Sequence, residues 1–147
     1  MEQKKIDAIR AFNRWYTNII GLLDRHLLHS TFSLPEARVL YELYHREGIL
    51  AGEIVSTLKM DKSYLSRMLD QFNRKKMISR RRSATDARAL LIFLTAKGKK
   101  EAEALDRASN KQIADILTGL QEKQTEQLVY HMQEIQKILS DETNHRS

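Results

Sequence analysis

Residues 74–95 read RKKMISRRRSATDARALLIFLT, and the fold of the chain follows from this stretch. Seven of its first fifteen residues are Lys or Arg, and Asp86 is the single acidic residue among them. The charge then stops, and Ala89–Thr95 is rich in Leu, Ile and Phe. MISRRR and ALLIFLT have the composition of strands, and the SATDA between them forms turns readily. The stretch therefore predicts a β-hairpin with its arginines on one arm and near the tip, anchored to the core by the apolar arm.

Two short helices are predicted directly before this hairpin, over 52–58 and from Asp61 onward. Asp61 is a favourable N-cap, and residues 59–61 have the length of the turn in a helix-turn-helix. The second helix turns outward small hydroxyls and long cations, which suit the major groove of DNA: Lys62, Ser63, Ser66, Arg67, Asp70 and Arg74. A solvated amphipathic helix would show the same face, so this helix alone leaves both readings open. Together with the basic hairpin it predicts a winged helix-turn-helix over residues 33–95.

The helix that opens this core has both of its ends marked in the sequence. Ser33 and Glu36 have the spacing of a capping box, and Pro35 is tolerated in the first turn. Gly48 has the position of a C-cap. We therefore expect a helix between Ser33 and Gly48.

Long amphipathic helices are predicted on both sides of the winged helix. Apolar residues recur at three-and-four spacing from Ile6 to about Leu28, and again in two helices after Thr95. These apolar stripes exceed what one small DNA-binding core needs. Residues 1–30 and 96–140 therefore predict dimerisation helices, within one domain that spans 1–147.

The composition limits the class of protein. The chain has 147 residues, 41% of them hydrophobic and 30% charged, and it lacks cysteine. This composition is that of a soluble globular chain in a reducing cytoplasm, without disulfides or a Cys-ligated zinc site. No apolar stretch approaches the roughly 20 residues that span a membrane. The sequence shows no phosphate-binding glycine loop, no catalytic spacing of Ser, His and Asp, and no metal-ligand cluster. We therefore expect no enzyme, no cofactor, no metal and no membrane partner.

The charge is concentrated in the middle of the chain. The net charge is +6, but Lys59–Lys100 alone holds thirteen basic and three acidic residues. The rest of the chain holds twelve basic and sixteen acidic residues. A basic middle within a mildly acidic chain predicts a polyanionic partner, most often nucleic acid.

Two segments resemble the MarR (multiple antibiotic resistance regulator) family, and the resemblance extends over nearly the whole chain. SYLSRMLDQFNRKKMISR (63–80) is similar to its recognition helix and first wing strand, and DARALLIFLTAKGKK (86–100) to its wing. The resemblance implies a mostly α fold with about six helices, a two-stranded β wing and a MarR-like homodimer. It implies a regulator, with a repressor as our expectation, that binds a palindromic operator in double-stranded DNA and is released by a small-molecule effector.

The resemblance also carries residue roles. Arg88 resembles the wing arginine that enters the minor groove, and Asp86 resembles the acid that orients it, at a spacing that allows a local ion pair. Ser63, Ser66 and Arg67 lie where the family contacts bases and phosphates. The expected DNA-binding residues are Lys62, Ser63, Ser66, Arg67, Arg74, Arg81, Arg82, Asp86 and Arg88.

An effector pocket is also expected, with Arg38 pairing with an anionic ligand among aromatic rings. Its candidate residues are Phe12, Trp15, Tyr16, Arg38 and Tyr41, and plain core packing explains the rings equally well. The N-terminal segments IRAFNRWYTNIIGLLDRHLL and FSLPEARVLYEL are similar to MarR domains fused to a GNAT-type acetyltransferase. The regulatory DNA-binding half of such a fusion, an RNA-binding winged helix and a dimeric scaffold that binds no DNA therefore stay open as alternatives.

Overall fold

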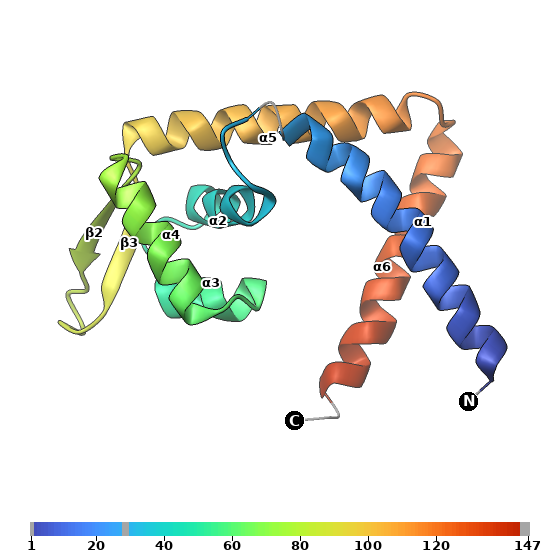
Figure 1. Cartoon of the computed structure of the whole chain (residues 1–147), viewed down its shortest axis with the longest axis horizontal. Coiled ribbons are helices and arrows are strands. Elements are labelled where there is room, and N and C mark those ends of the chain that lie inside the picture. The colour runs from blue at the N-terminus through green and yellow to red at the C-terminus, as the bar shows by residue number, and fades with distance from the viewer. Residues whose placement is uncertain (1, 28–29, 145–147) are drawn as a thin grey trace. The chain divides into compact units, whose positions relative to one another are not determined.

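The computed structural model describes residues 2–27 and 30–144 of the chain, which form two compact units, 1–109 and 110–147. The described part contains six helices and three strands (Figure 1): α1 (Gln3–Leu27), α2 (Leu34–His45), β1 (Ile49–Leu50), α3 (Ala51–Leu58), α4 (Lys62–Arg74), β2 (Ile78–Arg82), β3 (Leu90–Leu94), α5 (Ala96–Leu117) and α6 (Glu122–Asn144). The mostly α winged-helix prediction is confirmed. The expected end of the first helix, Leu28, lies outside the described residues, and the single domain over 1–147 stays a prediction.

The helix α2 starts where the sequence predicts, but it ends earlier than the prediction. Ser33 and Glu36 form the predicted capping box, in which the Glu36 amide donates to Ser33 Oγ at 3.3 Å. The helix ends at His45, with Arg46 as its C-cap, so the prediction of Gly48 as the cap is wrong. Gly48 has φ +72° in the turn before β1, and a Cβ atom there would lie 3.1 Å from Cζ of Phe93. Glycine is needed at this position for both the backbone conformation and the aromatic neighbour.

The sheet has one strand more than the predicted two-stranded wing. Its order is β1-β3-β2, with both pairs antiparallel. The β2–β3 hairpin is the predicted wing, whereas the two-residue strand β1 pairs with the other edge of β3 through Ile49–Ile92 and Leu50–Leu91. A strand of two residues has no alternation for a sequence pattern to reveal. The added strand holds the wing against the chain that connects α2 to α3.

The buried core belongs to the winged helix. Apolar side chains of α2, α3, α4 and the sheet converge, and the largest of them that are fully buried are Phe72, Leu40, Leu43, Ile54, Leu65, Met77, Ile92 and Val39. Burying each such side chain contributes about 1.5–3 kcal/mol to folding. The helix α4 and the base of the wing therefore share one core.

The first turn of α5 packs closely on the turn between α4 and β2. Thr95 caps the helix, because its Oγ1 accepts from the Gly98 amide at 3.1 Å and donates to the Lys76 carbonyl oxygen at 2.7 Å. A Cβ atom on Gly98 would lie only 2.0 Å from the carbonyl oxygen of Met77. Only glycine permits this approach of the two backbones.

Apolar side chains remain exposed in the 110–147 unit. They lie at the end of α5, in the turn that follows it and along α6: Ile113, Ile116, Leu120, Val129, Tyr130, Met132, Ile135 and Ile138. Among the described helices, none is long and apolar enough to cross a membrane.

Candidate nucleic-acid interface

The helix α4 presents one face to the core and the other to solvent. Asp61 caps it as predicted, with its Oδ2 accepting from the Tyr64 amide at 2.9 Å. Leu65, Met68, Leu69 and Phe72 are buried. The predicted polar residues are all exposed: Lys62, Ser63, Ser66, Arg67, Asp70 and Arg74. Because the buried stripe fixes the rotation of α4, the polar face has one defined direction.

The strand register gives the three consecutive arginines of β2 different surroundings. Side chains alternate along a strand, so Arg80 shares a face with the buried Ile78, and Arg81 points to the opposite face. On the inner face, Arg80 Nη2 lies 3.1 Å from Oδ1 of Asp70 on α4. On the outer face, the Arg81 guanidinium lies 4.7 Å from the centre of the Phe93 ring, within the range of a cation–π contact.

The Asp70–Arg80 ion pair ties α4 to the wing, and the DNA-binding residues expected from the sequence do not include Arg80. The sequence does contain a pattern that indicates the direction of the Arg80 side chain. Ile78 had to be buried, so the residue two positions later had to face α4. A cavity of about 340 Å³ lies between α3, α4 and the strands, with Lys62, Ser66 and Arg80 among its polar lining residues. The helix and the wing thus form the two walls of one groove.

A hydrogen bond to the backbone shapes the tip of the wing. Asp86 Oδ1 accepts from the backbone amide of Arg88 at 2.9 Å, and the Ala89 amide donates to the Asp86 carbonyl oxygen at 3.1 Å. Among the described residues, the guanidinium of Arg88 forms no ion pair with Asp86, so the local pair that the spacing allows is not formed. Asp86 fixes the backbone from which the exposed Arg88 side chain extends.

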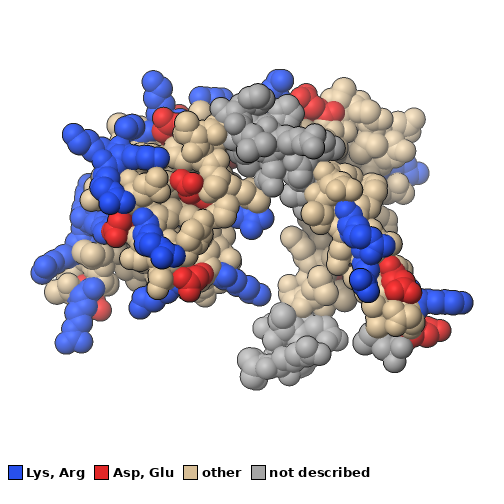
Figure 2. Space-filling view, viewed as in Figure 1, with Lys and Arg blue, Asp and Glu red and all other residues tan. Residues whose placement is uncertain are grey.

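Cations cover the winged helix, as Figure 2 shows at the left of the view. Some of them have partners: Lys99 Nζ lies 3.0 Å from Glu47 Oε1, and Lys97 Nζ donates to the Lys75 carbonyl oxygen at 2.9 Å. Within the described part of the chain, others are exposed and form no ion pair: Lys59, Lys62, Arg67, Arg74, Arg82 and Arg88. Unpaired like charges on α4 and the wing repel one another, so a polyanion bound there would relieve the repulsion.

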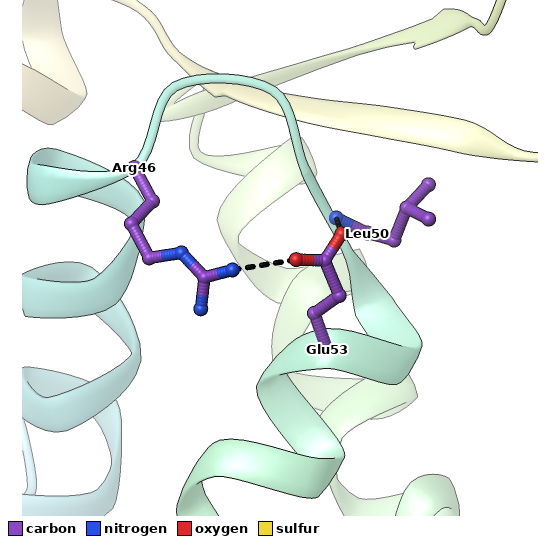
Figure 3. Close-up of polar contacts among 3 residues, drawn as sticks. All are labelled: Arg46, Leu50 and Glu53. Atoms are coloured by element: carbon purple, nitrogen blue, oxygen red, sulfur yellow. Dashed lines mark hydrogen bonds and ion pairs between the residues drawn. The ribbon is translucent and has the colours of Figure 1, made fainter.

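A brace holds the loop between α2 and α3, which carries β1. Arg46 Nη2 donates to Glu53 Oε2 at 2.6 Å, and Glu53 Oε1 accepts from the Leu50 amide at 3.4 Å (Figure 3). Since Leu50 pairs with Leu91, the brace reaches strand β3 of the wing. Both charged side chains are partly exposed, so the pair contributes at most about 1 kcal/mol, and its effect is to position the loop.

The expected effector residues fall into two groups. On α1, the Phe12 ring stacks on Tyr16 with centroids 5.5 Å apart and lies 6.0 Å from Trp15. On α2, the Tyr41 ring contacts His45 at 4.2 Å. Arg38 instead lines a cavity of about 200 Å³ with Leu34, Pro35, Leu58, Met60 and Tyr64. None of the described cavities brings Arg38 together with the rings of α1, and the effector pocket stays a prediction.

One polar contact joins α2 to the first part of α5. The Tyr44 hydroxyl donates to Glu103 Oε1 at 3.3 Å. The negative charge of Glu103 raises the pKa of Tyr44, so the phenol remains a neutral donor near neutral pH. Within the described residues, no three His, Cys, Asp or Glu side chains are grouped as metal ligands would be.

Part of the chain is similar to a known protein family. Residues 30–89 match the family model described as MarR family. The HTH-type transcriptional regulator TtmR of Methylorubrum extorquens (strain PA1) is 33% identical over 92 residues, which cover 63% of this chain and 44% of that protein. The chain therefore spans less than half the length of this curated relative.

Two solved structures with this fold contain DNA. Streptococcus pneumoniae FabT in complex with DNA has a TM-score of 0.79 at 18% identity, covering 95% of this chain and 99% of that chain. The Staphylococcus aureus MepR–DNA complex has a TM-score of 0.73 at 24% identity, covering 88% of this chain and 97% of that chain. At these identities the likeness establishes the shared winged-helix fold.

Proposed function

We propose that this chain, whose residues 30–89 match the MarR family model, is a regulator of transcription that binds double-stranded DNA. The observation that carries the proposal is the set of exposed, unpaired cations on α4 and the wing, two elements that share one core. The DNA complexes of FabT and MepR support it, because those proteins have the same fold.

In the proposed complex, α4 enters the major groove with its N-terminal turns foremost, as helix-turn-helix proteins do. Ser63, Ser66 and Arg67 then lie toward base edges and phosphates, flanked by Lys62 and Arg74. Arg88 extends from the wing tip toward the minor groove, where a narrow groove concentrates negative potential. Arg81 and Arg82 add contacts to the phosphate backbone.

The proposed assembly is a homodimer joined through α1, α5 and α6. Ile116, Val129 and Ile135 are each more than two-fifths exposed, which is costly for an isolated chain in water. We expect sedimentation to show a dimer at micromolar concentration and Ile135→Asp to shift it to monomer. Gln136→Asp, which adds the same charge one position along α6, is the matched control. A monomeric wild-type chain would contradict the proposal.

The two-fold symmetry of such a dimer predicts the form of the DNA site. Two copies of α4 should contact two half-sites spaced by about one helical turn, roughly 10 base pairs. Footprinting should therefore protect a palindrome on duplex DNA, and an excess of structured RNA should fail to compete. Protection of a single half-site, or displacement by the RNA, would contradict this function and favour the RNA-binding alternative.

The proposal extends to the direction of regulation and to its control by a small molecule. We expect a cytoplasmic repressor whose release is triggered by a small molecule bound near Arg38 and the aromatic rings of α1. The alternatives are the regulatory half of an acetyltransferase fusion and a scaffold that binds no DNA. Reading the gene beyond codon 147 tests the first of these, and genome-wide mapping of bound DNA tests the second.

A further inference from the structure

Two lysines adopt a backbone conformation that suits glycine better. Among the described residues, the non-glycine residues with positive φ are Lys59 at +50° and Lys76 at +60°. Lys59 lies three residues before the first residue of α4, and Lys76 lies two residues after its last residue. In the left-handed region the Cβ atom of an L-residue crowds the backbone, so glycine would be less strained at both positions.

Hydrogen bonds and packing fix the turn that contains Lys59. Its backbone amide donates to the Val55 carbonyl oxygen, and the Met60 amide donates to the same oxygen at 3.2 Å. Met60 packs against the core, while Asp61 is occupied as the cap of α4. The Lys59 side chain is exposed and has no ion pair or hydrogen bond with the rest of the described chain. The backbone of Lys59 is therefore fixed in the turn, while its ammonium group extends into solvent without a partner among the described residues.

The position of the turn suggests what this ammonium group contacts. Lys59 lies three residues before Lys62, at the end of α4 that enters the groove in a helix-turn-helix. The walls of the major groove are rows of phosphates, so a cation at this end lies at the rim of the groove.

The geometry at the other end of α4 is different. Lys76 lies beyond the far end of the 13-residue helix, about 20 Å along its axis. Its carbonyl oxygen accepts from Thr95 Oγ1 at 2.7 Å, within the turn that seats α5. Lys76 therefore belongs to the packing of α5 and serves as an internal reference for Lys59.

We propose that Lys59 is a phosphate contact at the rim of the major groove, a role that rests on the proposed DNA-binding function. The contact is independent of base sequence, because an ammonium group is a point charge without a fixed hydrogen-bonding pattern. It should strengthen binding to the operator and to random duplex equally.

The test compares Lys59→Gly with Lys76→Gly in the full-length chain. Both variants remove one positive charge and relieve the same backbone conformation, so both should fold at least as stably as the wild type. Binding to operator and to random duplex is measured over a salt series. Lys59→Gly should lower both affinities by about 8-fold per subunit at 0.1 M salt, and reduce the log–log salt slope by about 0.9 per subunit. Lys76→Gly should leave the slope unchanged, and Lys59→Arg should restore it.

Each other outcome has a distinct meaning. Equal losses in the two glycine variants would show a bulk charge effect and overturn the role of Lys59. A wild-type slope in Lys59→Gly would overturn it as well, while leaving DNA binding itself intact. A wild-type chain that binds no duplex at all would instead overturn the proposed function.

Discussion

Arg88→Ala should weaken binding to the operator by about 5- to 150-fold per subunit, the effect of losing about 1–3 kcal/mol of specific arginine contact. The affinity for random duplex should fall by a smaller factor, the one that follows from losing one positive charge. The two factors differ because a minor-groove arginine reads the width of the groove as well as its charge. Titrations of both duplexes, with circular dichroism to verify the fold, provide the measurement.

The Arg81→Ala variant is the control for this experiment. Its guanidinium lies over the Phe93 ring on the outer face of the wing. We expect its removal to weaken operator and random duplex by similar factors. If Arg88→Ala also weakened both duplexes equally, Arg88 would be an ordinary phosphate contact.

Asp86→Ala separates positioning from charge at the same tip. Removing a negative charge from the wing should by itself tighten all DNA binding. Asp86, however, accepts a hydrogen bond from the Arg88 amide and so sets the backbone that carries this arginine. We therefore expect operator binding to fall while random binding rises slightly. Tighter operator binding would mean that the wing acts as a charged surface without a positioned arginine.

Gly98→Ala should destabilise the winged helix by about 3 kcal/mol, the upper end of the cost of overpacking a core. The added methyl group would meet the Met77 carbonyl oxygen at 2.0 Å, and a backbone atom cannot turn aside as a flexible side chain does. The turn between α4 and β2 or the start of α5 must then shift. Thermal unfolding should show a melting temperature lower by roughly 10 °C.

Gly52→Ala is the matched control for this prediction. Gly52 lies in α3, and a Cβ atom there would meet nothing within 4 Å. Because alanine is the better helix former, this variant should gain up to about 1 kcal/mol. A wild-type melting temperature for Gly98→Ala would show that the two backbones separate readily, and that the close approach does not constrain α5.

The sequence predicted those features of the fold that arise from local chemistry. Asp61 and Ser33 are polar caps next to apolar periodicity, and the arginine-rich hairpin has an obvious turn. The register of a strand was also available in principle, because a buried Ile78 requires Arg80 to face α4. The DNA-binding residues expected from the sequence nevertheless leave out Arg80.

Other features depend on contacts between distant segments, which local patterns do not contain. The strand β1 exists because Ile49 meets Ile92, forty-three positions away, in a pair too short to leave a pattern. The sequence pattern predicts Gly48 at a helix end, whereas its positive φ serves the turn that passes the Phe93 ring. The residues expected to share an effector pocket were chosen by residue type alone, and type does not determine which helices bring them together.

The Asp70–Arg80 pair has a consequence for the lifetime of the proposed DNA complex. Because it joins α4 to the wing over a shared core, binding of α4 to the major groove presents the wing to the same duplex at high effective concentration. Dissociation then requires both contacts to open before either re-forms. Loosening this pair should raise the dissociation rate while leaving the association rate, which long-range charge controls, nearly unchanged.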